Sequence, residues 1–234
     1  STAFRTDPSW AYGIPELKGQ REKILRSNKI ANPGCHATGF IMLLKPFIEK
    51  GILSKDMSFS ATSLTGYSGA GKKMIERYQN KDFSEKLQPP AHYALTLNHK
   101  HLKEMQKITD LTYPPIFTPI ISSYYQGMIV SIPVHRRELS SDLSLSDFHF
   151  ILKDYYKDEK FVKVMDLDFD KYLEDGFLSP VKCNDTNNIE LFVFGNEDRF
   201  LLSSRFDNLG KGASGAAVQN MNIVLGFDET AGLI

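Results

Sequence analysis

The sequence has little cysteine. Only Cys35 and Cys183 occur in 234 residues, and they lie far apart and outside any Cys-x-x-Cys spacing. This pattern excludes a disulfide framework and does not indicate a zinc site. A protein of the reducing cytoplasm is expected.

The sequence also lacks an excess of charge of either sign. Lys plus Arg and Asp plus Glu each number 28, so neither nucleic acid nor an anionic membrane is expected as the main partner. The longest apolar run, 39–44, is too short to cross a bilayer, and the N-terminus has no signal-peptide pattern. The 41% hydrophobic residues are enough to fill the core of a soluble domain.

Helix and strand patterns are both present. Apolar spacing predicts helices over 18–26, 37–50, 72–79, 102–110, 145–156 and 216–225. Alternating patterns predict strands over 57–64, 127–134, 161–167, 189–194 and 200–204. The turn at 195–198 joins the last two strands as a hairpin, so the sheet is expected to be antiparallel there.

Cys35 is the first candidate nucleophile. It follows Asn32-Pro33-Gly34 and lies where the helix over 37–50 begins. Unpaired backbone N–H groups and the positive end of the helix dipole favour a thiolate at such a position. A lone cysteine is also often a small buried hydrophobic residue, and the pattern leaves both interpretations open.

Two histidines, His99 and His101, come just before the helix over 102–110. Either imidazole would exchange protons with Cys35 if the fold brought them together. Histidines near helix ends are also common without any function. A metal site is not expected, because the pair has no further ligand nearby in the sequence.

Two glycine patterns suggest phosphate binding. The first, GxxxxGK at 66–72, lies between a predicted strand and a predicted helix, but Lys73 replaces the Ser or Thr with which a P-loop binds magnesium. A P-loop hydrolase is thus a weaker alternative, while the loop can still bind phosphate through backbone N–H groups. The second, GxGxxG at 210–215, is followed by too few residues for a dinucleotide fold, and its glycines equally suit a closely packed last helix.

Five short blocks follow one another along the chain: 1–6 (STAFRT), 31–35 (ANPGC), 68–72 (SGAGK), 99–105 (HKHLKEM) and 210–222 (GKGASGAAVQNMN). In this order they resemble the N-acetyl-gamma-glutamyl-phosphate reductases, and most closely the shorter of the two forms of that family. The resemblance extends over essentially the whole chain.

The resemblance implies an α/β with α+β fold. A remnant of a Rossmann NADP-binding domain (1–34) would precede a catalytic and dimerisation domain (35–208) like that of aspartate-semialdehyde dehydrogenase, with a mixed, largely antiparallel sheet. A C-terminal helix (209–234) would return to the first segment. Most of the Rossmann half is expected to be missing from the sequence, which should weaken NADPH binding, and a homodimer or homotetramer is expected.

The resemblance also implies the reaction and the residues that perform it. Cys35 would attack the acyl phosphate, phosphate would leave, and NADPH would reduce the thioester to the semialdehyde. His101, in preference to His99, would act as acid and base. The implied substrate contacts are Arg5, Tyr93, Glu104 and Ser68, and the implied NADP(H) contacts are Pro33, Ser68, Gly69, Ala70, Gln219 and Asn220.

Two positions depart from the family's usual residues. Leu102-Lys103 stands where a proline often precedes the glutamate, and His36 stands where a tyrosine is common. The remaining alternative to an enzyme is a catalytically idle module for substrate binding and oligomerisation, in which Cys35 would be an ordinary thiol.

Overall fold

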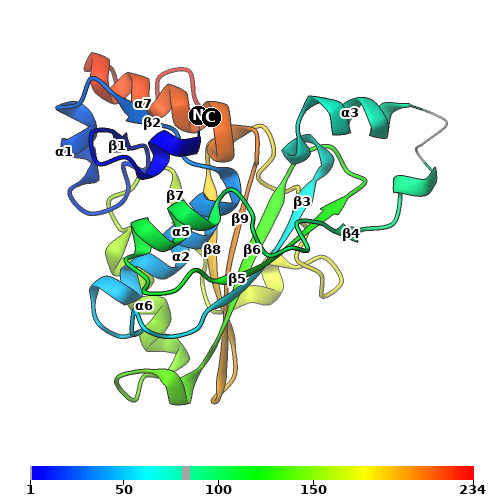
Figure 1. The fold of residues 1–234 in the computed structure, drawn as a ribbon. Coiled ribbons are helices and arrows are strands. Elements are labelled where there is room, and N and C mark those ends of the chain that lie inside the picture. Colours follow the sequence, from blue (N-terminus) through cyan, green and yellow to red (C-terminus); the bar gives the residue numbers. More distant parts are fainter. Residues whose placement is uncertain (1, 81–84) are drawn as a thin grey trace.

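A seven-stranded sheet with the strand order β4-β5-β3-β6-β9-β8-β7 forms the centre of the computed structural model, which describes residues 2–80 and 85–234 (Figure 1). Its strands are β3 (Ser60–Gly66), β4 (Ala91–His92), β5 (Ile116–Ser122), β6 (Met128–His135), β7 (Val162–Val164), β8 (Ile189–Gly195) and β9 (Arg199–Phe206). The pairs β3–β5 and β7–β8 are parallel, and the other neighbours are antiparallel. The predicted mixed, largely antiparallel sheet is confirmed.

Helices cover one face of this sheet (Figure 1). The α-helices within the described residues are α1 (Gln20–Leu25), α2 (Cys35–Glu49), α3 (Lys72–Gln79), α5 (Leu102–Thr109), α6 (Leu145–Tyr155) and α7 (Gly215–Leu225). Each one was predicted, and their ends differ from the predicted ranges by at most two residues. Strand β5 was missed because it contains Pro119, a residue that cannot donate a ladder hydrogen bond and argues against a strand between two neighbours.

Helix α2 is the central element of the core. It is buried around most of its circumference, between the sheet and helices α5 and α6. Its close approach to the sheet requires Gly39, because a Cβ there would lie 2.6 Å from Ser204 Oγ and 2.8 Å from Val130 Cγ2. The fixed position of α2 also fixes Cys35, its first residue.

The N-terminal and C-terminal segments of the chain lie side by side (Figure 1). The short parallel pair β1 (Ala11–Tyr12) and β2 (Ile30–Ala31) and helix α1 lie next to α7. Buried polar contacts join them: Lys211 pairs with Glu16, Gln219 donates to the same carboxylate at 2.8 Å, and Asn220 donates to the carbonyl of Gly13 at 3.0 Å. The assignment of 1–34, 35–208 and 209–234 to separate domains stays a prediction.

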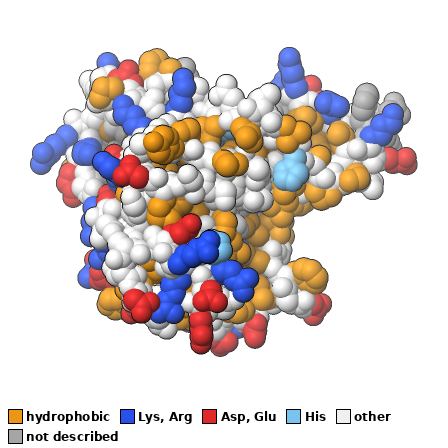
Figure 2. Space-filling view, turned by 60° about the horizontal axis from the view of Figure 1, so that its bottom comes forward, with side chains coloured by type: hydrophobic (Ala, Val, Ile, Leu, Met, Phe, Trp, Pro, Cys, Tyr) orange, Lys and Arg blue, Asp and Glu red, His pale blue; other side chains and the backbone are white. Residues whose placement is uncertain are grey.

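Basic and acidic side chains lie next to one another along the lower edge of the surface in Figure 2, as expected from their equal numbers. On the opposite side of Figure 1 from α1, helix α3 extends away from the sheet. None of the helices in the described part of the chain is both long and apolar enough to cross a membrane.

Candidate active site

Cys35 lies at the N-terminus of α2, as the sequence predicted. The preceding Gly34 is extended (φ −80°, ψ 143°), and the chain turns into the helix at Cys35. On the other side, a Cβ on Gly212 would lie 2.9 Å from Cys35 Cβ, so the glycine stretch before α7 forms a wall of the site. That stretch is a π-helical turn (Gly210–Ser214), and its glycines serve close packing.

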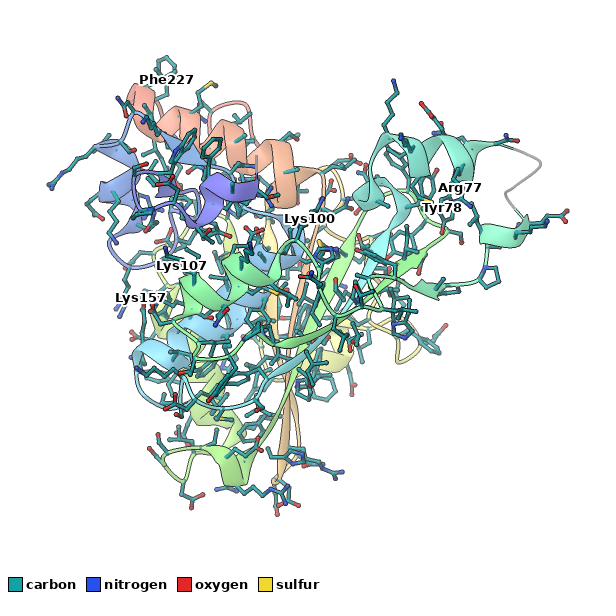
Figure 3. All side chains as sticks on the ribbon, in the orientation of Figure 1. Arg77, Tyr78, Lys100, Lys107, Lys157 and Phe227 are labelled. Carbon is teal, nitrogen blue, oxygen red and sulfur yellow. The ribbon has the colours of Figure 1, made fainter. Side chains whose placement is uncertain are left out.

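The protonation of Cys35 differs from the expectation. Burial raises the pKa of the Cys35 thiol to about 11, and it outweighs the hydrogen bond from the His36 backbone N–H and the charge of Lys100, which both lower it. Lys100 is labelled near the middle of Figure 3, just before α5. The expectation of a favoured thiolate was wrong because it counted the helix start but not the desolvation of the sulfur.

The carboxylate of Glu104, on α5, is buried behind this turn. Its Oε1 pairs with Arg5 Nη1 at 2.9 Å, and its Oε2 accepts hydrogen bonds from Tyr12 Oη at 2.8 Å and from the Gly34 N–H at 3.0 Å. Burial raises the pKa of Glu104, and the Arg5 charge and the two donors act against this rise. Glu104 and Arg5 therefore support the residue before Cys35, and their contact with substrate stays a prediction.

His101 and His99 lie beside the same turn. A Cβ on Gly34 would come within 2.4 Å of His101 Nε2, so the buried ring packs directly on the residue before Cys35. The backbone N–H of His101 donates to His99 Nδ1 at 3.2 Å, which leaves the His99 proton on Nε2. Burial lowers the pKa of His99 to about 4 and that of His101 further, so both rings are neutral at neutral pH.

Two further side chains belong to this cluster. Tyr93 donates to or accepts from His36 Nε2 at 2.8 Å, and the His36 and His101 ring centroids are 5.5 Å apart. His36 was not among the predicted site residues. Its departure from the family's usual tyrosine, directly after Cys35, was the signal in the sequence.

The loop of Ser68, Gly69 and Ala70 forms a 3₁₀ turn between β3 and α3. Ser68 Oγ is buried and accepts a hydrogen bond from Asn208 Nδ2 at 2.9 Å, and within the described residues no hydrogen bond joins this loop to Cys35. The first glycine of the GxxxxGK pattern, Gly66, is required by packing. A Cβ at this position would lie 2.5 Å from the carbonyl oxygen of Tyr125. The Lys72 side chain is 92% exposed.

Gln219 and Asn220 differ in whether a polar side-chain atom is left without a hydrogen-bond partner and could bind a ligand. Both polar atoms of Gln219 are used within the protein, by Glu16, Glu229, Lys211 and Asn187. Asn220 Oδ1 is buried without a partner among the described residues, and so is Asn32 Oδ1, beside Pro33. Asn32 and Asn220 line one cavity of about 300 Å³ together with apolar residues of β2 and α7.

Residues 2–80 and 85–234 contain no cluster of three His, Cys, Asp or Glu side chains with the geometry of a metal site. Cys35 and Cys183 are both free thiols. The groups near Cys35 that can exchange protons are its own thiol, the imidazoles of His36, His99 and His101, and the carboxylate of Glu104.

Known proteins share the family and the fold of this chain. Residues 35–208 match the family described as semialdehyde dehydrogenase, dimerisation domain. Aspartate semialdehyde dehydrogenase from Francisella tularensis has the same fold, with a TM-score of 0.69 at 13% identity, over 95% of this chain and 72% of that chain. The Vibrio cholerae aspartate semialdehyde dehydrogenase II complexed with ASA gives a TM-score of 0.67 at 18% identity, over 96% of this chain and 70% of that chain. Fold and sequence thus define the class as semialdehyde dehydrogenase-like.

Sequence relatives narrow this class. N-acetyl-gamma-glutamyl-phosphate reductase 2 from Nostoc sp. is 43% identical over 100% of this chain and 75% of its own length. N-acetyl-gamma-glutamyl-phosphate reductase from Brucella ovis is 41% identical over 97% of this chain and 74% of its own length. The chain belongs to the N-acetyl-gamma-glutamyl-phosphate reductase family.

The raised pKa of Cys35 predicts the pH dependence of its alkylation. Because the thiolate is the reactive form and the folded pKa is about 11, the alkylation rate at Cys35 should rise about tenfold per pH unit through pH 9, without a plateau. The measurement is the iodoacetamide rate at the Cys35 peptide by mass spectrometry, with Cys35→Ser as the control. A plateau near neutral pH would show that the thiolate is stabilised after all.

Proposed function

We propose that this chain carries the catalytic site for NADPH-dependent reductive dephosphorylation of N-acetyl-glutamyl 5-phosphate to N-acetyl-glutamate 5-semialdehyde. The observation that carries the proposal is Cys35 at the start of α2 with the His101 ring packed on the preceding glycine. The names of the relatives at 43% and 41% identity support the substrate. We place the protein in the cytoplasm, where free thiols stay reduced.

In the first step the Cys35 sulfur forms a bond to the acyl carbon. The bond from this carbon to the phosphate oxygen breaks, phosphate leaves with the electron pair, and a thioester remains. The thiol proton would pass to His101, whose ring is neutral at neutral pH. Burial lowers the pKa of this ring and makes it a weak base, so the transfer depends on stabilisation of the charges that it forms. Glu104 Oε1, 3.9 Å from His101 Nε2, would stabilise the resulting imidazolium.

The residues around Cys35 suit the developing charges. Backbone N–H groups at the start of α2 can donate to the oxyanion of the tetrahedral intermediate. Arg5, whose side chain is 21% exposed, can reach an anionic group of the substrate while it stays paired with Glu104. Tyr93 and Ser68 are the further substrate contacts that we propose.

NADPH, when bound, supplies the hydride that converts the thioester to the aldehyde. Two acceptors without partners, Asn32 Oδ1 and Asn220 Oδ1, fit the carboxamide N–H groups of a nicotinamide. Pro33 is next to Asn32 in the chain, and we propose the Ser68, Gly69 and Ala70 turn as a phosphate contact of the cofactor.

Gln219 has no free polar atom for this cofactor, so its contact would have to be apolar or follow a rearrangement.

A catalytically idle module is the second candidate, because burial raises the pKa of Cys35 to about 11. A thiol that stays protonated and meets no working base would not react with an acyl phosphate. The same folded site would then only bind substrate and oligomerise.

Acylation of Cys35 separates the two candidates without any cofactor. The chain should release phosphate from N-acetyl-glutamyl phosphate or acetyl phosphate and gain the acyl mass on Cys35 in intact-protein mass spectrometry. Cys35→Ser should show neither, and His101→Gln should acylate roughly 10²-fold more slowly, because the proton acceptor is lost. Unfolding curves check that both variants fold, and absence of acylation in the parent chain would establish the idle module.

We propose a homo-oligomer that forms through the sheet face opposite α2 and α6. Its side chains include Thr62 and Thr118, hydrogen-bonded at 3.1 Å, and Ser131 and Ser203, hydrogen-bonded at 2.9 Å, and Thr62 is exposed. On β3, β5 and β6 this face carries exposed or half-buried side chains, whereas Ser203 on β9 is buried within the chain. The exposed part of the face and the match to a dimerisation domain both support this surface.

Thr62→Arg should therefore shift the chain from oligomer to monomer in sedimentation velocity, because it places an unpaired charge within the interface. Ser141→Arg, in the exposed loop before α6, is the matched control and should leave the oligomer unchanged. If the parent chain is a monomer, or if both variants behave alike, the interface lies elsewhere or does not form.

A further inference from the structure

His36 is held on both sides of its ring. Its Nδ1 lies 2.8 Å from Ser63 Oγ, on β3, and its Nε2 lies 2.8 Å from the Tyr93 hydroxyl. Phe117 and His99 pack against the ring, with centroid distances of 5.2 and 5.4 Å. The side chain is 1% exposed, so its orientation is fixed by these neighbours.

The protons in this chain of hydrogen bonds can be assigned from burial. Ser63 is fully buried, and its hydroxyl has no side-chain or backbone acceptor other than His36 Nδ1 among the described residues. A buried hydroxyl proton without an acceptor is costly, so Ser63 donates to Nδ1. The neutral imidazole then carries its proton on Nε2 and donates it to the Tyr93 oxygen.

We infer that His36 is a positioning residue that orients the Tyr93 hydroxyl as a hydrogen-bond donor toward an oxygen of the substrate beside Cys35. With its oxygen occupied by His36 Nε2–H, Tyr93 has its own proton free. The opposite tautomer would direct the Tyr93 proton to His36 and leave only an acceptor for the substrate. Ser63 thus fixes the tautomer of His36, and His36 makes Tyr93 the donor in its contact with substrate. The His36 ring itself is too deeply buried to touch substrate.

The surroundings of His36 keep its imidazole ring neutral, in one tautomer, and disfavour the charged imidazolium. Burial lowers the pKa of His36 to about 3, and the neighbouring His99 and Lys100 act in the same direction. Burial, followed by the nearby Cys35, also raises the pKa of Tyr93, so its hydroxyl keeps its proton. A neutral donor next to the nucleophile suits a carbonyl or carboxylate oxygen, and in this respect the inference rests on the proposed function.

The tautomer is measured in the substrate-free chain. Long-range proton–nitrogen NMR at pH 7 should show His36 with a protonated Nε2 and an unprotonated Nδ1, the signal being assigned by its loss in His36→Gln. Ser63→Ala, which removes the donor to Nδ1, should give a mixture of tautomers. A parent chain protonated at Nδ1 would overturn the inference whatever its activity.

The effect on binding is measured with N-acetyl-L-glutamate as the probe, through its protection of Cys35 against iodoacetamide. Tyr93→Phe should weaken protection roughly three- to tenfold, as expected for one hydrogen bond. His36→Asn, which reaches Ser63 but not Tyr93, should weaken it as much, and His36→Gln, whose amide extends to Tyr93, should restore most of it. The double variant His36→Asn/Tyr93→Phe should be no weaker than either single variant.

The outcomes separate the inference from the proposed function. If the parent chain is not protected by N-acetyl-L-glutamate, the proposed substrate fails, and the NMR tautomer alone decides the orientation of Tyr93. If protection occurs but His36→Asn and Tyr93→Phe weaken it additively, the two side chains act independently and the inference is wrong. Unfolding midpoints of all variants exclude loss of fold as the cause.

Discussion

The buried carboxylate of Glu104 is the contact on which the arrangement of the site depends. It joins three parts of the chain that are far apart in sequence: Arg5 near the N-terminus, Tyr12 on β1 and the Gly34 N–H before α2. A carboxylate taken out of water is costly unless donors surround it, and these three donors offset that cost. Because Gly34 directly precedes Cys35, the position of Cys35 follows from the same contact.

Burial also determines the chemistry of the site. It raises the pKa of Cys35 and lowers those of His36, His99 and His101, so the thiol and the three imidazoles are all neutral at neutral pH. In the reaction that we propose, charge separation would then occur when the thiol transfers its proton. We propose that Arg5, Glu104 and the start of α2 stabilise the charges that form.

Much of this arrangement was visible in the sequence, and the rest depends on contacts between distant residues. The position of Cys35 at a helix start followed from Asn-Pro-Gly before an apolar helical pattern, because both signals are local. Strand β5 was hidden by Pro119, which is tolerated because tertiary pairing with β3 outweighs local preference. The contact between His36 and Tyr93 spans 57 positions, and no local pattern reports it.

The most direct test of the central role of Glu104 is hydrogen exchange at the Gly34 amide, measured by NMR. We expect this amide to be protected in the parent chain and to exchange roughly tenfold faster or more in Glu104→Gln, because a charged acceptor is lost. The Leu44 amide, in the middle of α2, should be unaffected and serves as the internal control. A Gly34 amide that exchanges freely in the parent chain, or equally slowly in both proteins, would contradict the account.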